Sequence, residues 1–191
     1  MELRDRILDA AAKVYSETGF RGATTRRIAE RAGVNEITLF RHFGSKTRLL
    51  HEAIRCAGIA SNLCVLPARP ADPRAELATW AQSTFRELFA RRSLIRTAMG
   101  ELEERPDLLP PDESHTVCAG QELHGYLERL RAMGMIRSDI DLMAATMMFM
   151  GTLFADAITR DIIPAMYRQD PQHSIVHYVD LIARALDLKE S

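Results

Sequence analysis

A short segment near the amino terminus carries residues that could read a nucleic acid. It runs from Gly33 to Lys46 with the sequence GVNEITLFRHFGSK. On a helix, side chains three and four positions apart share a face, so Ile37, Thr38 and Arg41 would project together. An isoleucine or threonine methyl can contact the methyl of thymine, and an arginine can give two hydrogen bonds to guanine in the major groove. This face therefore predicts contacts with DNA bases.

The residues around this face have the spacing of two short helices joined by a tight turn. Thr24 or Thr25 can cap the first helix, and Asn35 can cap the second. Gly33 lies between them and allows the positive φ that a tight turn requires. Ser45 can cap a longer helix that follows. The pattern predicts a helix-turn-helix with the base-reading face on its second helix.

Three basic residues lie in the first turns of these expected helices. They are Arg26 and Arg27 after the threonines and Lys46 after Ser45. The helix dipole disfavours a cation there by roughly 0.3 to 1 kcal/mol. A bound phosphate would reverse that cost, because helix amino termini attract anions. The alternative is that all three are solvated surface bases.

The charges of the 191-residue chain are unevenly distributed. Residues 1–50 carry ten Lys or Arg against six Asp or Glu, a net charge of +4. Residues 51–191 have fifteen against twenty, a net charge of −5. A basic end on a nearly neutral chain is typical of a protein that contacts a polyanion.

The rest of the chain also has the apolar periodicity of helices and no hairpin signal, so the expected fold is all-α. We expect a helix-turn-helix DNA-binding domain over residues 1–47 and a helical ligand-binding and dimerisation domain over residues 48–191. Beyond residue 60, the apolar pattern indicates helices near residues 77–89, 94–104, 113–133, 141–160 and 174–186. An additional helix near residues 3–18 would end at Thr18 and Gly19.

Residues 24–46, TTRRIAERAGVNEITLFRHFGSK, resemble the signature of the tetracycline repressor (TetR) family. The resemblance implies a repressor that binds a palindromic double-stranded operator as a homodimer and responds to a small-molecule effector. It implies phosphate contacts from Thr24 or Thr25, His42 and Lys46. Many family members have a phosphate-binding tyrosine where this chain has Phe40, whose contact must be apolar. The expected DNA-binding residues are Thr24, Thr25, Arg27, Asn35, Ile37, Thr38, Phe40, Arg41, His42 and Lys46.

The last two long helices are the expected dimer interface. Residues Leu142 to Ala155 are apolar on every face, which is unsuited to the surface of a small monomer. Pairing with a symmetry mate would give a four-helix interface around a two-fold axis, whereas the alternative is burial in a monomeric bundle. The final helix would contribute Ile175, Val176, Val179, Ile182, Ala183 and Leu186.

A ligand pocket is expected between the central helices, because several large, adaptable side chains could line it. Three polar residues among the candidates could orient the ligand, and His124 has no partners at metal-ligand spacing. The candidate ligand-binding residues are Trp80, Thr84, Phe85, Phe89, Arg96, Met99, His124, Tyr126, Met147, Met150 and Phe154.

Other functional classes are disfavoured. The chain has no glycine-rich phosphate loop, Gly-x-Ser-x-Gly motif or paired acidic metal motif, so we expect no enzyme activity and no cofactor. Glu101, Glu103 and Glu104 resemble a solvated helix end. The amino terminus lacks the apolar segment of a signal peptide, and Leu142 to Ala155 is shorter than the ~20 residues that span a bilayer. These features predict a cytoplasmic protein without a membrane partner.

The cysteines support the same location, because Cys56, Cys64 and Cys118 have the spacing of neither a zinc site nor a disulfide framework. Two functional hypotheses remain. The first is a ligand-responsive transcriptional regulator, and the second is a helical interaction protein whose helix-turn-helix binds a protein partner.

Overall fold

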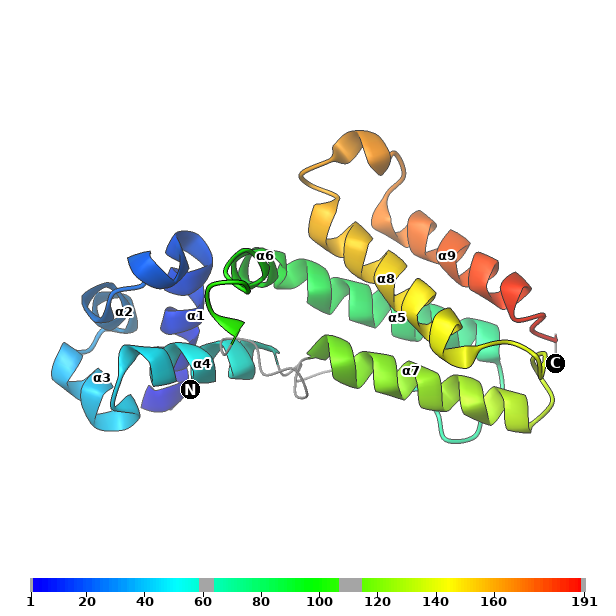
Figure 1. Ribbon diagram of the computed structural model, residues 1–191, viewed down its shortest axis with the longest axis horizontal. Coiled ribbons are helices and arrows are strands. Elements are labelled where there is room, and N and C mark those ends of the chain that lie inside the picture. The colour runs from blue at the N-terminus through cyan, green and yellow to red at the C-terminus, as the bar shows by residue number, and fades with distance from the viewer. Residues whose placement is uncertain (1, 59–63, 107–114, 190–191) are drawn as a thin grey trace. The chain divides into compact units, whose positions relative to one another are not determined.

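The computed structural model describes residues 2–58, 64–106 and 115–189, and within these ranges the chain is helical with no β-strand (Figure 1). The predicted all-α class is confirmed. The elements are α1 (Leu3–Gly22), α2 (Thr25–Ala32), α3 (Glu36–Phe43), α4 (Lys46–Gly58), α5 (Pro73–Ala90), α6 (Arg92–Gly100), α7 (His115–Ala132), α8 (Leu142–Thr159), the 3₁₀ helix η2 (Pro164–Met166) and α9 (Pro171–Ala185).

These helices form two compact units. Unit 1 contains α1 to α4 together with α6, and unit 2 contains α5 and α7 to α9. The units are groups of residues in mutual contact, so the functional boundary expected at residue 47 remains a prediction.

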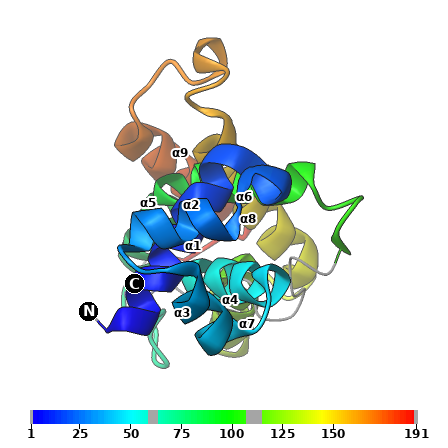
Figure 2. The same cartoon turned by 90° about the vertical axis from the view of Figure 1, so that its left-hand side faces the viewer.

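Unit 1 is built around α1, which packs against α2, α4 and α6. Figure 2 views this unit from the side on which α2 and α3 lie nearest the reader. Leu39 and Phe43 turn inward from α3 and are almost fully buried, as their spacing predicts. Arg4 on α1 lies over the Phe43 ring, with its guanidinium carbon 5.6 Å from the ring centroid. The inner face of α3 is thus fixed against α1, and its outer face is left exposed.

Local capping sets the start of each short helix in unit 1. The Thr24 hydroxyl accepts a hydrogen bond from the Arg27 amide at 3.3 Å, so Thr24 rather than Thr25 is the cap of α2. The Asn35 side chain accepts from the Thr38 amide at 2.8 Å, and the Ser45 hydroxyl accepts from the Arg48 amide at 3.2 Å. Each cap satisfies an amide that the helix itself cannot.

Two glycines of unit 1 have positive φ for different reasons. Gly33 has φ 67° and closes the turn between α2 and α3, as predicted. Gly19 has φ 66° and ψ −178°, so the backbone leaves the helical conformation there, as predicted, before a short helical segment runs on to Gly22. A Cβ at Gly19 would lie 2.7 Å from Oε1 of Glu101, so glycine also makes room for that carboxylate.

Unit 2 packs α5 against α8 and α9 around the buried Trp80. The Trp80 ring stacks on Phe149 of α8 with the ring centroids 6.3 Å apart. Its indole N–H donates to Glu122 of α7 at 3.3 Å, and the Tyr126 hydroxyl of α7 donates to Glu76 of α5. Trp80 therefore contacts both α7 and α8.

A buried ion pair lies at the carboxyl-terminal end of α8. Arg160 donates to both carboxylate oxygens of Asp156, at 2.6 and 2.7 Å, and Asp156 is only 1% exposed. Arg160 also donates to the hydroxyl of Ser174, and Tyr178 donates to Asp156 at 2.8 Å. Burial and the bond to Asp156 raise the pKa of Tyr178 to about 12. This network ties the end of α8 to α9.

Helix α9 begins at Pro171, three residues before the predicted start. Asp170 accepts hydrogen bonds from the amides of Gln172 and His173 at 3.0 and 3.1 Å, so it caps the helix. Proline fits the first helical position, because an amide there would have no partner within the helix. The Asp-Pro pair is therefore the start signal that apolar periodicity missed.

Candidate functional site

The outer face of α3 exposes both apolar and basic side chains. Ile37 is 77% exposed and Phe40 is 49% exposed. Arg41 and His42 are exposed beside them, and Thr38 is half-buried. A large apolar side chain that is fixed on a helix and left in water marks a contact surface. The structure thus brings together the residues that we expect to contact bases.

Polar residues around α3 hold that face in place. The Thr38 hydroxyl donates to the Asn35 side chain at 2.9 Å, so the capping amide orients Thr38 as well. The Thr25 hydroxyl donates to Glu36 at 2.6 Å and links the start of α2 to the start of α3. Asn35 and Thr25 therefore set the geometry of the helix pair.

The three bases in the first helical turns have different surroundings. Arg26 donates to Glu30 within α2 at 3.0 Å. Arg27 donates to the Gly22 carbonyl at 3.4 Å. Lys46 instead lies over the Phe20 ring, with Nζ 4.4 Å from its centroid. Lys46 is the cation of the three that an incoming phosphate can reach without displacing a carboxylate or a carbonyl.

A second cation lies on the same ring. The guanidinium carbon of Arg105 is 3.6 Å from the Phe20 centroid. Burial and the charge of Arg105 lower the pKa of Lys46, whereas Glu101 opposes that shift. A bound phosphate would relieve the repulsion between the two cations, so Arg105 joins Lys46 as a candidate phosphate contact.

Glu101 anchors this region, contrary to the solvated helix end predicted from the sequence. Its carboxylate accepts from the Phe20 amide at 2.7 Å and from the Tyr15 hydroxyl at 2.9 Å. Burial and this hydrogen bond raise the pKa of Tyr15. The prediction was wrong for Glu101 because its partners lie more than eighty residues earlier in the chain, whereas Glu103 and Glu104 are exposed as expected.

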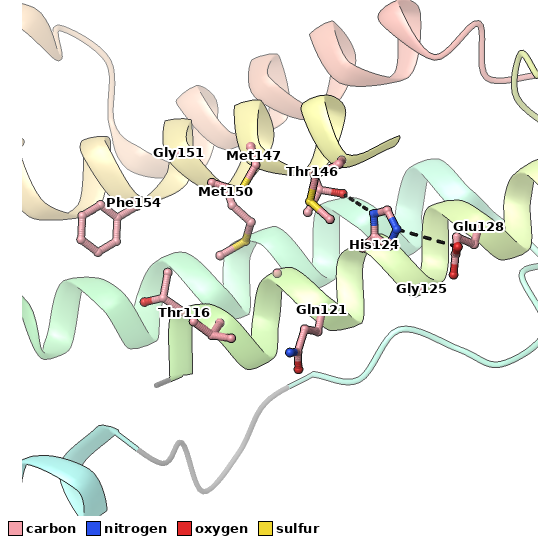
Figure 3. Close-up of a pocket in the computed structure, with 13 residues that line it drawn as sticks. Thr116, Gln121, His124, Gly125, Glu128, Thr146, Met147, Met150, Gly151 and Phe154 are labelled. Atoms are coloured by element: carbon pink, nitrogen blue, oxygen red, sulfur yellow. Dashed lines mark hydrogen bonds and ion pairs between the residues drawn. The ribbon is translucent and has the colours of Figure 1, made fainter. Parts of the chain in front are cut away.

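Unit 2 contains a groove of about 570 Å³ between α7 and α8 (Figure 3). Two stripes at helical spacing line it, and most of the residues are apolar or glycine. Thr116, Gln121, His124, Glu128 and Thr146 are the polar members. The described residues that line it are Thr116, Val117, Gly120, Gln121, His124, Gly125, Glu128, Met143, Thr146, Met147, Met150, Gly151 and Phe154.

Four of the predicted ligand residues line this groove: His124, Met147, Met150 and Phe154. Six others do not. Trp80, Thr84, Phe85 and Tyr126 are buried in the core of unit 2, and Arg96 and Met99 belong to α6 in unit 1. Phe89 stacks on Phe85 at 5.8 Å along α5.

The polar end of the groove is organised around His124. Its Nδ1 lies 3.4 Å from the Thr146 hydroxyl oxygen, and its Nε2 lies 3.8 Å from a carboxylate oxygen of Glu128. The Thr146 hydroxyl donates to the Leu142 carbonyl at 2.7 Å. Figure 3 shows these groups at one end of the groove and Phe154 at the other.

The described part of the chain has no group of three or more His, Cys, Asp or Glu side chains that could hold a metal ion. Cys56, Cys64 and Cys118 are free. Thr146 and Glu128 lie beside His124, and one imidazole with these two groups does not resemble a metal site.

Helix α8 exposes apolar residues on a second face, away from the groove. Met148 is 71% exposed, and Ala144, Thr152 and Ala155 are exposed along the same stripe. By length and composition α8 could cross a membrane, but 44% of its span is buried, and it packs against α5 and α9 as a core helix does. The second face is therefore an uncovered side of a core helix.

Helix α9 differs from the interface predicted for it. Ile175, Val179, Ile182, Ala183 and Leu186 are buried in unit 2, so five of the six residues expected to face a symmetry mate are core instead. Val176 is 47% exposed, and Leu181, which was not predicted, is 65% exposed.

Comparisons with known proteins agree with this geometry. Residues 7–53 match the family of bacterial regulatory proteins described as the tetR family. The chain is 30% identical to the HTH-type transcriptional repressor KstR2 of Rhodococcus jostii. The alignment spans 149 residues, which are 73% of this chain and 70% of that protein. The chain is 29% identical to the HTH-type transcriptional regulator YvkB of Bacillus subtilis. That alignment spans 155 residues, which are 81% of this chain and 81% of that protein. A crystal structure of a TetR-family regulator from Mesorhizobium loti has a TM-score of 0.76 at 18% identity, with 96% of this chain and 94% of that chain covered.

Proposed function

The chain belongs to the TetR family of transcriptional regulators, and on that premise we propose that it is a homodimeric repressor, released from a palindromic operator by a small apolar effector. The exposed face of α3 is the observation that carries this proposal. Ile37, Thr38 and Arg41 read bases in the major groove, and Lys46 and His42 contact phosphates. Thr24 and Thr25 add phosphate contacts from the start of α2.

The homodimer is supported by the second face of α8. Met148 and its small neighbours form an uncharged stripe that water would otherwise cover. Pairing this stripe and the exposed Val176 and Leu181 of α9 with a symmetry mate gives a four-helix interface. To enter successive major grooves of a palindrome, the two copies of α3 in the dimer must lie about 34 Å apart.

The effector function is supported by the groove between α7 and α8. Its size and mostly apolar lining fit a small molecule. A ligand shifts the repressor away from DNA only by its differential affinity for the two states, and a 100-fold preference supplies about 2.7 kcal/mol. Operator DNA must then weaken ligand binding by the same factor. A DNA-binding regulator of this kind works in the cytoplasm.

Selection of bound sequences from random double-stranded DNA tests this function. We expect the full-length protein to enrich a palindrome, because two copies of α3 read two half-sites. An Arg41→Glu variant is the control, since a carboxylate on the α3 face repels the base edges and phosphates. Enrichment of nothing at low salt would favour the alternative, in which the helix-turn-helix binds a protein partner.

A further inference from the structure

The groove between α7 and α8 has an unbalanced charge. Among the thirteen described residues that line it, Glu128 is the one acidic residue, and none is Lys or Arg. A carboxylate or phosphate ligand would lose hydration there without meeting a fixed cation. An ammonium group would meet a carboxylate instead, and a charge-assisted hydrogen bond is about twice as strong as a neutral one.

The hydrogen bonds of Thr146 determine what His124 offers. The Thr146 hydroxyl has a single proton, which it donates to the Leu142 carbonyl. Its oxygen can therefore only accept from His124, so the ring carries its proton on Nδ1. In the neutral imidazole, Nε2 then presents a lone pair on the side where Glu128 lies 3.8 Å away. Both groups accept hydrogen bonds.

This preference belongs to the neutral His124 ring. An imidazolium would direct its Nε2–H at Glu128, could accept no hydrogen bond from an amine and would repel its positive charge. The side chain of Glu128 is 56% exposed, so a charged head group bound to it stays close to water. The polar end of the groove therefore accepts a hydrated, hydrogen-bond-donating head.

The rest of the groove suits a long apolar tail. From Met143 to Phe154 the lining of α8 spans eleven residue steps, or about 16 Å along the helix. The polar His124 lies at one end of this length, and Phe154 lies at the other (Figure 3). Methionine side chains such as Met147 and Met150 adapt to flexible apolar chains.

Building on the effector function above, we propose that the groove binds an elongated apolar molecule ended by a protonated amine. The amine lies between His124 Nε2 and the Glu128 carboxylate, and the tail runs along α8 toward Phe154. Of the amphiphiles that share such a tail, the groove selects the cationic one over the neutral and anionic ones.

Three probes with the same tail test the head group directly: decylammonium, decanol and decanoate. Trp80 fluorescence follows their binding to the full-length protein, because Trp80 contacts both helices that line the groove. Calorimetry gives a second measurement, and each probe is kept below the concentration at which it aggregates. We expect decylammonium to bind at least about tenfold more tightly than decanoate. An unchanged circular dichroism spectrum excludes unfolding by the probe.

A variant of the acidic residue separates the head group from the tail. Glu128→Gln should weaken decylammonium by about three- to tenfold and leave decanol unchanged, because the groove shape is retained. Glu104→Gln on an exposed acid of unit 1 makes the same change in net charge and should alter neither probe. The proposal is overturned if decanoate binds as tightly as decylammonium, if Glu128→Gln weakens all probes alike, or if none of them binds.

Operator binding measured with the same samples separates this proposal from the repressor function. If decanol or decanoate binds best and releases the operator, the head-group assignment fails and the effector-released repressor stands. If decylammonium binds through Glu128 but leaves operator affinity unchanged, the groove chemistry holds and the release function fails.

Discussion

Unit 1 and unit 2 each leave a helix face uncovered, but the two faces differ in chemistry. Helix α3 presents Ile37 and Phe40 among polar and basic side chains, including the exposed Arg41. Helix α8 presents Met148 in an uncharged stripe of small residues. A mixed face tolerates water and gains from a polyanion, whereas an uncharged face gains from another apolar surface.

The two units also differ in how their helices are held. Both units begin helices at local caps, such as Thr24 and Asn35 in unit 1 and Asp170 in unit 2. In unit 2 the end of α8 also depends on the buried Asp156–Arg160 pair and its bonds to α9. Changes in unit 1 should therefore affect binding more than folding, and changes in unit 2 should do the reverse.

The largest expected effect is loss of the buried ion pair. Asp156→Ala leaves the Arg160 guanidinium buried without its carboxylate, which costs about 3 to 5 kcal/mol of unfolding free energy. Chemical denaturation followed by circular dichroism measures this loss. Asp139→Ala is the control, because its pair with Arg137 is exposed and should matter little. Equal stability of the two variants would contradict a structural role for Asp156.

The next effect concerns assembly. Met148→Glu places a carboxylate in the proposed dimer interface, and burying an unpaired carboxylate costs several kcal/mol, so the dimer should dissociate. Light scattering gives the mass in solution. Met133→Glu makes the same change at a residue that is 55% exposed and lies outside the α8 stripe, so that variant should stay dimeric. A folded, dimeric Met148→Glu protein would remove α8 from the interface.

The DNA face should show smaller and more selective effects. Arg41→Ala should cost about 1 to 3 kcal/mol of operator binding and relax sequence preference, because a base contact is lost. Lys46→Ala should weaken all sequences alike and reduce the salt dependence, because a phosphate contact is lost. Titrations of operator and unrelated DNA at several salt concentrations separate the two. A similar loss of selectivity in both variants would argue against these roles.

Glu101→Gln should lower the free energy of unfolding by about 1 kcal/mol. The loss is small because glutamine keeps one acceptor for the Phe20 amide or the Tyr15 hydroxyl. The pKa of Tyr15 should also fall toward its ordinary value in Glu101→Gln, which phenolate absorbance measures. Glu103→Gln, on an exposed side chain, is the matched control and should change neither quantity.

The smallest expected effect is a pH dependence of folding stability, to which tyrosines of both units contribute. Tyr15, Tyr126 and Tyr178 all have raised pKa values, with that of Tyr178 raised to about 12. Above pH ~10 the unfolded tyrosines lose their protons while the folded ones keep theirs, so stability falls as pH rises. Tyr178→Phe should make this fall shallower between pH ~10 and ~12. An unchanged slope would show that Tyr178 ionises equally in both states.

Local signals explain why much of unit 1 could be predicted from the sequence. The caps Thr24, Asn35 and Ser45 each accept from an amide three residues away, and the turn at Gly33 needs the positive φ that glycine allows. The alternation of buried Leu39 with exposed Ile37 follows from helical periodicity. None of these features requires knowledge of a distant part of the chain.

The anchor at Glu101 and the lining of the groove depend on distant contacts, which is why the sequence did not reveal them. The sequence gives Glu101 the same pattern as exposed Glu103 and Glu104, because nothing near it in the chain indicates its hydrogen bonds to Tyr15 and Phe20. Periodicity places both His124 and Tyr126 on α7 but does not say which one faces a groove. That choice is made by the packing of α7 against α5 and α8.

The close approach of Gly19 and Glu101 has an evolutionary consequence. A side chain at position 19 would occupy the space of the carboxylate and would also strain a backbone with φ 66°. A lineage that replaces Gly19 would have to shorten or move the acid at position 101, and a lineage that loses the acid would no longer need the space. We expect these two positions, more than eighty residues apart in the chain, to be inherited together among close relatives and to change in step.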